Sequence, residues 1–286
     1  MAGGVFDGLL KEAKLRLKSD PEFAVKYYSR AIERAARKHG PDANQTLNLR
    51  QAYAVALSRN GENEKAQAEL AALIARRELL ADAGDGAVEH AREWLQHARE
   101  WHAHVLYALD RFDEAEPEWR ELSAERDRLL GANHPDAIDA HENHALTLAR
   151  LDRVAEAEAE MAGVVEKRAA AGGGDDPGTL GSRTSHAVYL DTLGRRADSE
   201  AAWRGLAEAK GRVLGSDHAD TLAARERLAV TLYEQRRLQE AAAEYGEVMA
   251  QRAAALGDDH PDTKRARDWR AAIVRELGSP RQDDQV

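Results

Sequence analysis

The chain contains no cysteine. It can therefore form no disulfide framework, no thiolate metal site and no cysteine nucleophile. It also has no apolar run long enough to span a bilayer, and its first residues lack the basic stretch and apolar run of a signal peptide. These absences predict a cytoplasmic protein that has no membrane partner.

Basic residues are scarcer than acidic ones, 41 against 51, so the formal net charge is -10. A surface of this sign does not attract DNA or RNA by bulk charge, and no nucleic-acid partner is expected. The Gly-x-Ser-x-Gly elbow, the phosphate-binding loop and the dinucleotide fingerprint are all missing. The sequence therefore gives no reason to expect a cofactor or one of these catalytic sites.

A phrase rich in glycine, histidine, proline and aspartate returns every 42 residues. Residues 131–136 read Gly-Ala-Asn-His-Pro-Asp, and related copies begin at Gly173, Gly215 and Gly257. A fixed period of this size indicates a solenoid built from helical hairpins. The glycine stands where a second helix should stop and predicts a left-handed cap, and the proline suits the first turn of the next helix.

Small residues recur in register on both helices of each predicted hairpin. On the second helices, each is followed four residues later by a bulky side chain; they are Ala24, Ala66, Ala115, Ala157, Ser199 and Ala241. On the first helices, each is followed three residues later by leucine or valine; they are Ala54, Ala103, Ala145, Ala187, Ala229 and Ala271. Two helices cross closely where both present small side chains, as we expect for Ala145 and Ala157. The neighbouring Glu158 is expected to point outward.

These periods predict an all-α, right-handed superhelical solenoid of six helix-turn-helix hairpins with a C-terminal capping helix. The hairpins are expected near residues 5–40, 44–84, 88–131, 136–173, 178–215 and 220–257, and the capping helix at 261–277. The array thus spans residues 1–278, and residues 279–286 are expected to form a flexible tail. Seven additional residues near 81–86 predict a longer loop or a longer helix at that join.

The hairpin length, the pair of small residues and the bulky residue after the second one resemble tetratricopeptide repeats. The 42-residue period, with Leu-Gly-x-x-His-Pro-Asp and Glu-Ala-Glu-Pro, resembles the kinesin light chain type, most closely over residues 112–136. This resemblance implies a scaffold that binds proteins or peptides and is not an enzyme. Members of that type often carry adjacent asparagines that clamp a peptide backbone, and here only Asn143 matches them.

In such an array the first helices line a concave groove. Residues roughly 100–150° around the helix from the core stripe are expected to face it. The predicted protein-binding residues are Gln51, Val55, Ser58, His97, Glu100, His104, Tyr107, Asp139, Glu142, Asn143, Leu146, Thr184, Val188, Asp191, Glu226, Val230 and Tyr233.

The charges of this set suggest the partner. The carboxylates predict an acidic floor beside an edge of arginines, and hence a basic protein or peptide segment with apolar anchors. The alternative is that each arginine pairs with a glutamate of a neighbouring helix, where a solvated pair contributes only about 0–1 kcal/mol. The apolar members, such as Leu146, Val188 and Val230, are more informative, because exposed apolar patches tend to mark binding surfaces.

Histidine offers a second hypothesis. His97, Glu100 and His104 lie at spacings of three and four, so they share one face of a helix, and such a set can hold zinc or iron. The pattern matches no established metal signature, and no metal ligands are predicted. The preferred function is a non-enzymatic scaffold; the alternatives are a sensor module for a peptide or small-molecule signal and a metal-dependent protein that uses this cluster. A homo-oligomer is not predicted.

Overall fold

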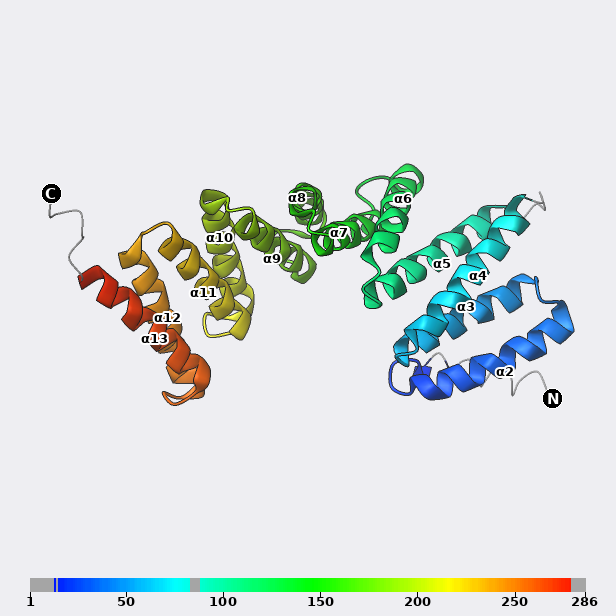
Figure 1. The fold of residues 1–286 in the computed structure, drawn as a ribbon, viewed down its shortest axis with the longest axis horizontal. Coiled ribbons are helices and arrows are strands. Elements are labelled where there is room, and N and C mark those ends of the chain that lie inside the picture. Colours follow the sequence, from blue (N-terminus) through cyan, green and yellow to red (C-terminus); the bar gives the residue numbers. More distant parts are fainter. Residues whose placement is uncertain (1–12, 14, 83–87, 279–286) are drawn as a thin grey trace. The chain divides into compact units, whose positions relative to one another are not determined.

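The computed structural model describes residue 13, residues 15–82 and residues 88–278. These residues form helices and short connections, without a β-strand among them (Figure 1). Most of the first expected helix, most of the join near 81–86 and the expected tail at 279–286 lie outside the described residues. The all-α prediction is confirmed.

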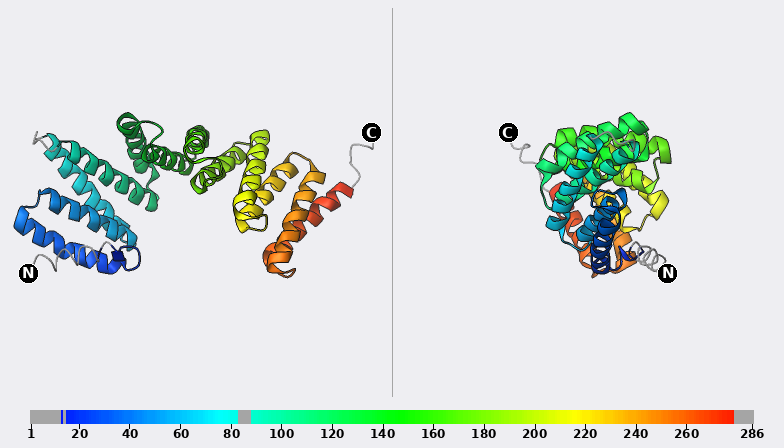
Figure 2. Two further views of the ribbon diagram at one scale, coloured as in Figure 1. Left: turned by 180° about the vertical axis from the view of Figure 1, so that it is seen from behind. Right: turned by 90° about the vertical axis from the view of Figure 1, so that its right-hand side faces the viewer.

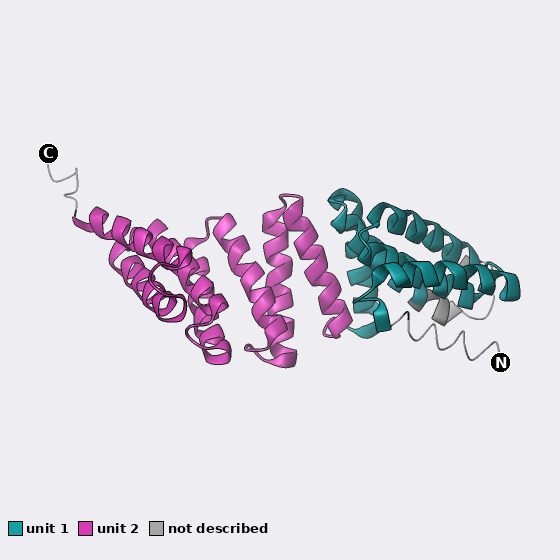
Figure 3. Cartoon of the chain, turned by 90° about the horizontal axis from the view of Figure 1, so that it is seen from below, with its two compact units in different colours: residues 1–131 teal, residues 132–286 magenta. Residues whose placement is uncertain are grey.

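Helices and short turns alternate along the described residues. The helices are α2 (Pro21–His39), α3 (Asn44–Arg59), α4 (Asn63–Asp82), α5 (Val88–Ala108), α6 (Phe112–Leu130), α7 (Pro135–Arg150), α8 (Val154–Gly172), α9 (Pro177–Thr192), α10 (Arg196–Leu214), α11 (Ala219–Glu234), α12 (Leu238–Leu256) and α13 (Pro261–Gly278). The chain divides into two compact units, residues 1–131 and 132–286 (Figure 3). Within each unit, every helix packs against the next one along the chain (Figure 2).

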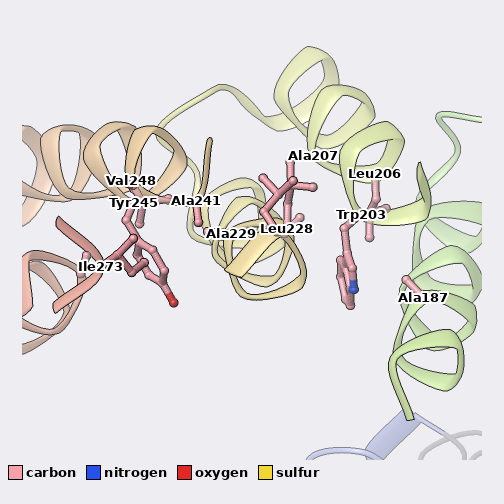
Figure 4. Close-up of a cluster of buried hydrophobic side chains, with 14 of the residues drawn as sticks. Ala187, Trp203, Leu206, Ala207, Leu228, Ala229, Ala241, Tyr245, Val248 and Ile273 are labelled. Atoms are coloured by element: carbon pink, nitrogen blue, oxygen red, sulfur yellow. The ribbon is translucent and has the colours of Figure 1, made fainter. Parts of the chain in front are cut away.

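The small residues occupy the helix crossings, as predicted. Ala145 of α7 and Ala157 of α8 are both fully buried and share one core cluster with Met161. Ala229 and Ala241 repeat this arrangement between α11 and α12 (Figure 4). The bulky residue four positions after the second small one is also buried in each described hairpin; these residues are Tyr28, Leu70, Trp119, Met161, Trp203 and Tyr245.

Glycine ends the second helices, but the predicted left-handed cap was wrong in one angle. At Gly173, φ is 90° and ψ is 159°, and Gly131, Gly215 and Gly257 adopt similar angles. The positive φ was expected, whereas the extended ψ places these residues in a region that is essentially restricted to glycine. The N–H of Gly173 still satisfies a helix carbonyl, that of Ala169, at 3.0 Å.

Each turn then passes into a capped helix. His134 and His218 precede α7 and α11, and the Nδ1 atom of each accepts a hydrogen bond from the backbone N–H two residues later, at 3.2 and 3.1 Å. Asp176 caps α9 in the same way with its carboxylate. The recurring phrase is therefore a helix stop followed by a helix start, and this role accounts for its histidine without a catalytic function.

Two glycines of α8 and its cap should respond to alanine with opposite signs. A Cβ atom would meet no atom within 4 Å at either Gly163 or Gly173, so only the backbone distinguishes them. Gly173→Ala should lower the free energy of unfolding by about 1–2 kcal/mol, because of its backbone angles. Gly163→Ala, inside the helix, should raise it by about 0.5–1 kcal/mol. Urea denaturation measures both; a stabilising Gly173→Ala would contradict the cap geometry.

Candidate protein-binding face

The helices α7, α9, α11 and α13 of the second unit touch one another through side chains. Ser182 of α9 donates to Glu142 of α7 at 2.6 Å, and Tyr233 of α11 donates to Glu276 of α13 at 3.0 Å. Thr231 of α11 lies 3.4 Å from a carboxylate oxygen of α9. These first helices of successive hairpins therefore form one continuous surface, called here the first-helix face.

A row of apolar side chains runs along this face at the repeat spacing. Leu146 of α7 and Val230 of α11 are half-buried against the core clusters, and Val188 of α9 is 37% exposed. The row continues into α13 as the exposed Ala272. Three predicted site residues thus stand at the same register position on α7, α9 and α11.

The carboxylates of the face are already neutralised within the protein. Glu142 binds Arg168 of α8 at 2.6 Å, and Glu226 binds Arg252 of α12 at 2.7 Å. Each arginine follows its glutamate by 26 residues. In α9 and α10 the same two positions hold Thr184 and Lys210, so the pair is missing there. The offset of 26 is visible in the sequence and could have revealed these partners.

The edge of basic residues is paired in a second register. Arg225 binds Glu244 at 2.9 Å and His141 binds Glu160 at 2.6 Å, in each case across 19 residues. For these residues the structure supports the alternative of pairing between neighbouring helices. The carboxylates predicted to form an acidic surface are consequently engaged in ion pairs between helices, and this surface presents little unpaired charge.

Asp191 joins three helices and has a structural role. Its carboxylate accepts hydrogen bonds from Ser199 and from the indole N–H of Trp203, the latter at 3.0 Å. Arg227 of α11 binds the same carboxylate at 2.5 Å and lies over the Trp203 ring, 5.5 Å from its centroid. Asp191 therefore stabilises the junction between the α9–α10 hairpin and α11.

The remaining polar residues of the predicted set in this unit bond mainly within the protein. The Asn143 side chain donates to the carbonyl of Asp139 at 2.8 Å, and Thr184 donates to the carbonyl of Leu180 at 2.7 Å. The Asp139 carboxylate, 53% exposed, binds Arg168 at 2.6 Å. Asn143, the one match to the asparagine pair, therefore has its amide engaged by its own helix.

In the first unit, two predicted site residues are not at the surface. Gln51 is 6% exposed and Val55 is 8% exposed, which corrects the expectation that they face a groove. The first helices α3 and α5 are in contact. This contact buries side chains of α3 that a helical wheel, drawn for α3 alone, places at the surface. The Ser58 hydroxyl donates to Oδ1 of Asn63 at 3.2 Å, and Tyr107 packs edge-on against Phe112.

The cluster of His97, Glu100 and His104 is not arranged as a metal site. Glu100 binds Arg126 at 2.8 Å. The His104 ring packs edge-on against Trp119, with the two ring centroids 4.7 Å apart. Burial favours the neutral form of Glu100, but hydrogen bonds from His97 and Arg126 outweigh it and lower its pKa to about 2. Burial lowers the pKa of His104. Across the described residues, no group of three or more His, Cys, Asp or Glu side chains could hold a metal ion.

A second acidic group with a shifted pKa should make the second unit sensitive to acid. Burial would raise the pKa of Glu160, but hydrogen bonds from His141 and His144 outweigh this and lower it to about 2. The folded-state pKa lies below the unfolded value, so the stabilisation is complete above about pH 4.5 and is lost as the pH falls toward 2. Glu160→Gln should flatten the fall in melting temperature between pH 5 and 2; an unchanged slope would contradict this assignment.

A cavity of about 260 Å³ lies between α10, α11 and α12, and not in the apolar row. Its lining includes Arg204, Glu208, Arg225 and Glu244 around a floor that contains Leu228. Sites for small molecules are usually larger and mostly apolar. This cavity therefore gives no support to the sensor alternative.

Comparison with known families agrees with the repeat geometry. A tetratricopeptide repeat model matches residues 103–136 and 221–262. The chain contains tetratricopeptide repeats. The first matched segment contains Ala103, Ala115 and Gly131, and the second contains the Ala229–Ala241 crossing and Gly257. No curated protein matches this sequence, and no helix among the described residues has the length and apolarity to cross a membrane.

Solved tetratricopeptide repeat structures share the fold at low identity. YrrB, a TPR protein with an unusual peptide-binding site, is 16% identical with a TM-score of 0.54, over 83% of this chain and 98% of that one. BtubC (BKLC) from P. vanneervenii is 13% identical with a TM-score of 0.55, over 92% and 96%. The kinesin light chain TPR-like repeats of Podosopora anserina are 16% identical with a TM-score of 0.43, over 87% and 96%. The likenesses to YrrB and BtubC support the fold alone.

Proposed function

We propose that this tetratricopeptide repeat protein is a non-enzymatic scaffold that binds a protein or peptide segment on the first-helix face. The observation that carries the proposal is the row of Leu146, Val188 and Val230 at one register position of α7, α9 and α11, in which Val188 is exposed and the other two are half-buried. Exposed apolar strips with polar surroundings mark interaction surfaces in soluble proteins. The peptide-binding site of YrrB, which shares the fold, supports the same class of function.

The apolar row should supply most of the affinity, and charge a smaller part. A basic partner was predicted from the carboxylates of the face, but Glu142 and Glu226 already bind arginines. An incoming cation would have to compete with those arginines. Asp139 remains 53% exposed although Arg168 binds it. A basic segment remains the proposed partner, with only a modest dependence of affinity on salt.

Two exposed valines allow a matched test of the face. A displayed peptide library selected on the full chain would provide the probe peptides. Val188→Asp, on α9, should weaken their binding at least about tenfold, because it places a charge in the apolar contact. Val213→Asp, on the second helix α10 at 45% exposure, should leave it unchanged.

The outcomes separate the two surfaces. Loss of binding only in Val213→Asp would assign the function to the second helices and refute the proposal. A steep fall of affinity with salt would show that charge, and not the apolar row, dominates. Glu142→Lys is a poor probe, because it would also break the bonds to Arg168 and Ser182.

A further inference from the structure

The last helix, α13, has one covered side and one open side. Ala266 and Ile273 are buried against α12, with Ile273 beside Tyr245 and Val248 (Figure 4). On the other side, Ala271 is exposed and Val274 is 47% exposed.

The residues at the same register on the earlier first helices are covered. Ala229 is 0% exposed and Leu232 is 1% exposed, because α12 packs on that side of α11. The equivalent pairs of α3, α5, α7 and α9 are buried to the same degree. The open side of α13 is therefore the side on which a second helix packs in the preceding hairpins.

The chain itself shows which kind of helix covers this side. Four of its second helices carry a small residue, a glutamate three positions later and a bulky residue one position after that; these segments are 66–70, 115–119, 157–161 and 241–245. The glutamate meets a basic residue of the first helix, as in Arg50–Glu69 at 2.6 Å and Arg225–Glu244 at 2.9 Å. Arg267 of α13 stands at the position of Arg225, one period later.

The charge of the open side favours an acidic helix. Lys264 and Arg267 flank Ala271 and are 52% and 44% exposed. Lys264 and Arg267 bind Asp259 and Asp258, which are 100% and 81% exposed. Solvated ion pairs of this kind exchange their partners at little cost in free energy. A second copy of α13 would bring these cations against cations. A carboxylate-bearing helix, in contrast, meets complementary charge.

We infer that the open side of α13 docks an amphipathic helix of a partner protein and so completes a seventh hairpin. That helix carries alanine or serine opposite Ala271, a glutamate three residues later that binds Arg267, and a bulky apolar residue one position further. This surface is distinct from the first-helix face, so either site can fail without the other.

A peptide with the sequence of residues 154–172 is a suitable probe, because it carries Ala157, Glu160 and Met161 in this register. Its binding to the full chain is measured by fluorescence anisotropy. Val274→Asp or Arg267→Glu in the protein should weaken binding at least about tenfold. Glu160→Lys in the peptide should restore binding to the Arg267→Glu protein. Val213→Asp, another exposed valine, should have no effect, and thermal melting should confirm that each variant is folded.

Several results would overturn the inference. One is the absence of saturable binding. Another is binding that Val274→Asp does not change, which would indicate that the peptide displaces α8 from its own hairpin. A doubled mass in light scattering that Val274→Asp abolishes would assign the open side to a second copy. Binding that requires removal of residues 279–286 would assign it to that segment.

Discussion

Replacing Glu226 by alanine is expected to lower the free energy of unfolding by about 3 kcal/mol, the cost of leaving one buried charge without its partner. The Glu226 and Arg252 side chains are only 18% and 9% exposed, and their charged atoms lie 2.7 Å apart. Without the carboxylate, the Arg252 guanidinium keeps a bond to the carbonyl of Asp262 at 3.3 Å. That neutral acceptor cannot compensate the charge in a partly dry site. The midpoint of urea denaturation measures the loss.

An exposed carboxylate of the same hairpin provides the control. Glu247 is 60% exposed and lies 3.9 Å from Arg225. Glu247→Ala should change the free energy of unfolding by no more than about 0.5 kcal/mol. The double variant Glu226→Ala, Arg252→Ala should lose less than the sum of the two single variants. Equal losses in Glu226→Ala and Glu247→Ala would show that the Glu226–Arg252 pair is not buried in solution.

The fold was predictable because its signals are local and repeated. A hairpin was expected near residues 44–84, where the structure has α3 (Asn44–Arg59) and α4 (Asn63–Asp82). Glycine ends a helix through its own backbone angles, and proline fixes the first turn through its ring. A helix boundary that is misplaced in one repeat can be corrected from the next repeat, because all copies share the same register. Among the described residues, the ψ angle of the glycine caps escaped this reasoning.

The site was harder to predict, because exposure depends on the neighbouring helices. Glu158 was expected to point outward, yet its side chain is 13% exposed and binds His186 at 2.9 Å and Arg195 at 3.0 Å. A helical wheel places a side chain relative to its own helix, whereas His186 comes from the next hairpin. Gln51 was misplaced for the same reason.

Ion pairing between neighbouring helices was an alternative to the acidic floor, and the sequence alone did not decide between them. Glu142 and Glu226 do carry negative charge on this face, but each binds an arginine 26 residues further along the chain. A carboxylate counts toward an acidic surface only if no cation of the same protein binds it. The repeat period, applied to charges as it was applied to alanines, reveals these partners.

The crossing of α7 and α8 allows the sharpest test of the repeat register. Ala157 and Ala145 are both 0% exposed within one cluster, so neither helix leaves room for a branched side chain. Ala157→Leu should cost about 3 kcal/mol, the upper end of the range for overpacking, because the helices themselves must separate. The melting temperature should fall by roughly 6–12 °C.

Ala159, two residues away on the same helix, is the matched control for this change because it is exposed. Ala159→Leu adds the same three carbon atoms and should cost less than about 0.5 kcal/mol. Glu158→Leu is unsuitable as a control, because it would break the bonds to His186 and Arg195. Ala145→Gly in the Ala157→Leu background should recover part of the loss, because it returns space at the crossing. Equal melting shifts for Ala157→Leu and Ala159→Leu would mean that the small residues do not set the contact between the helices.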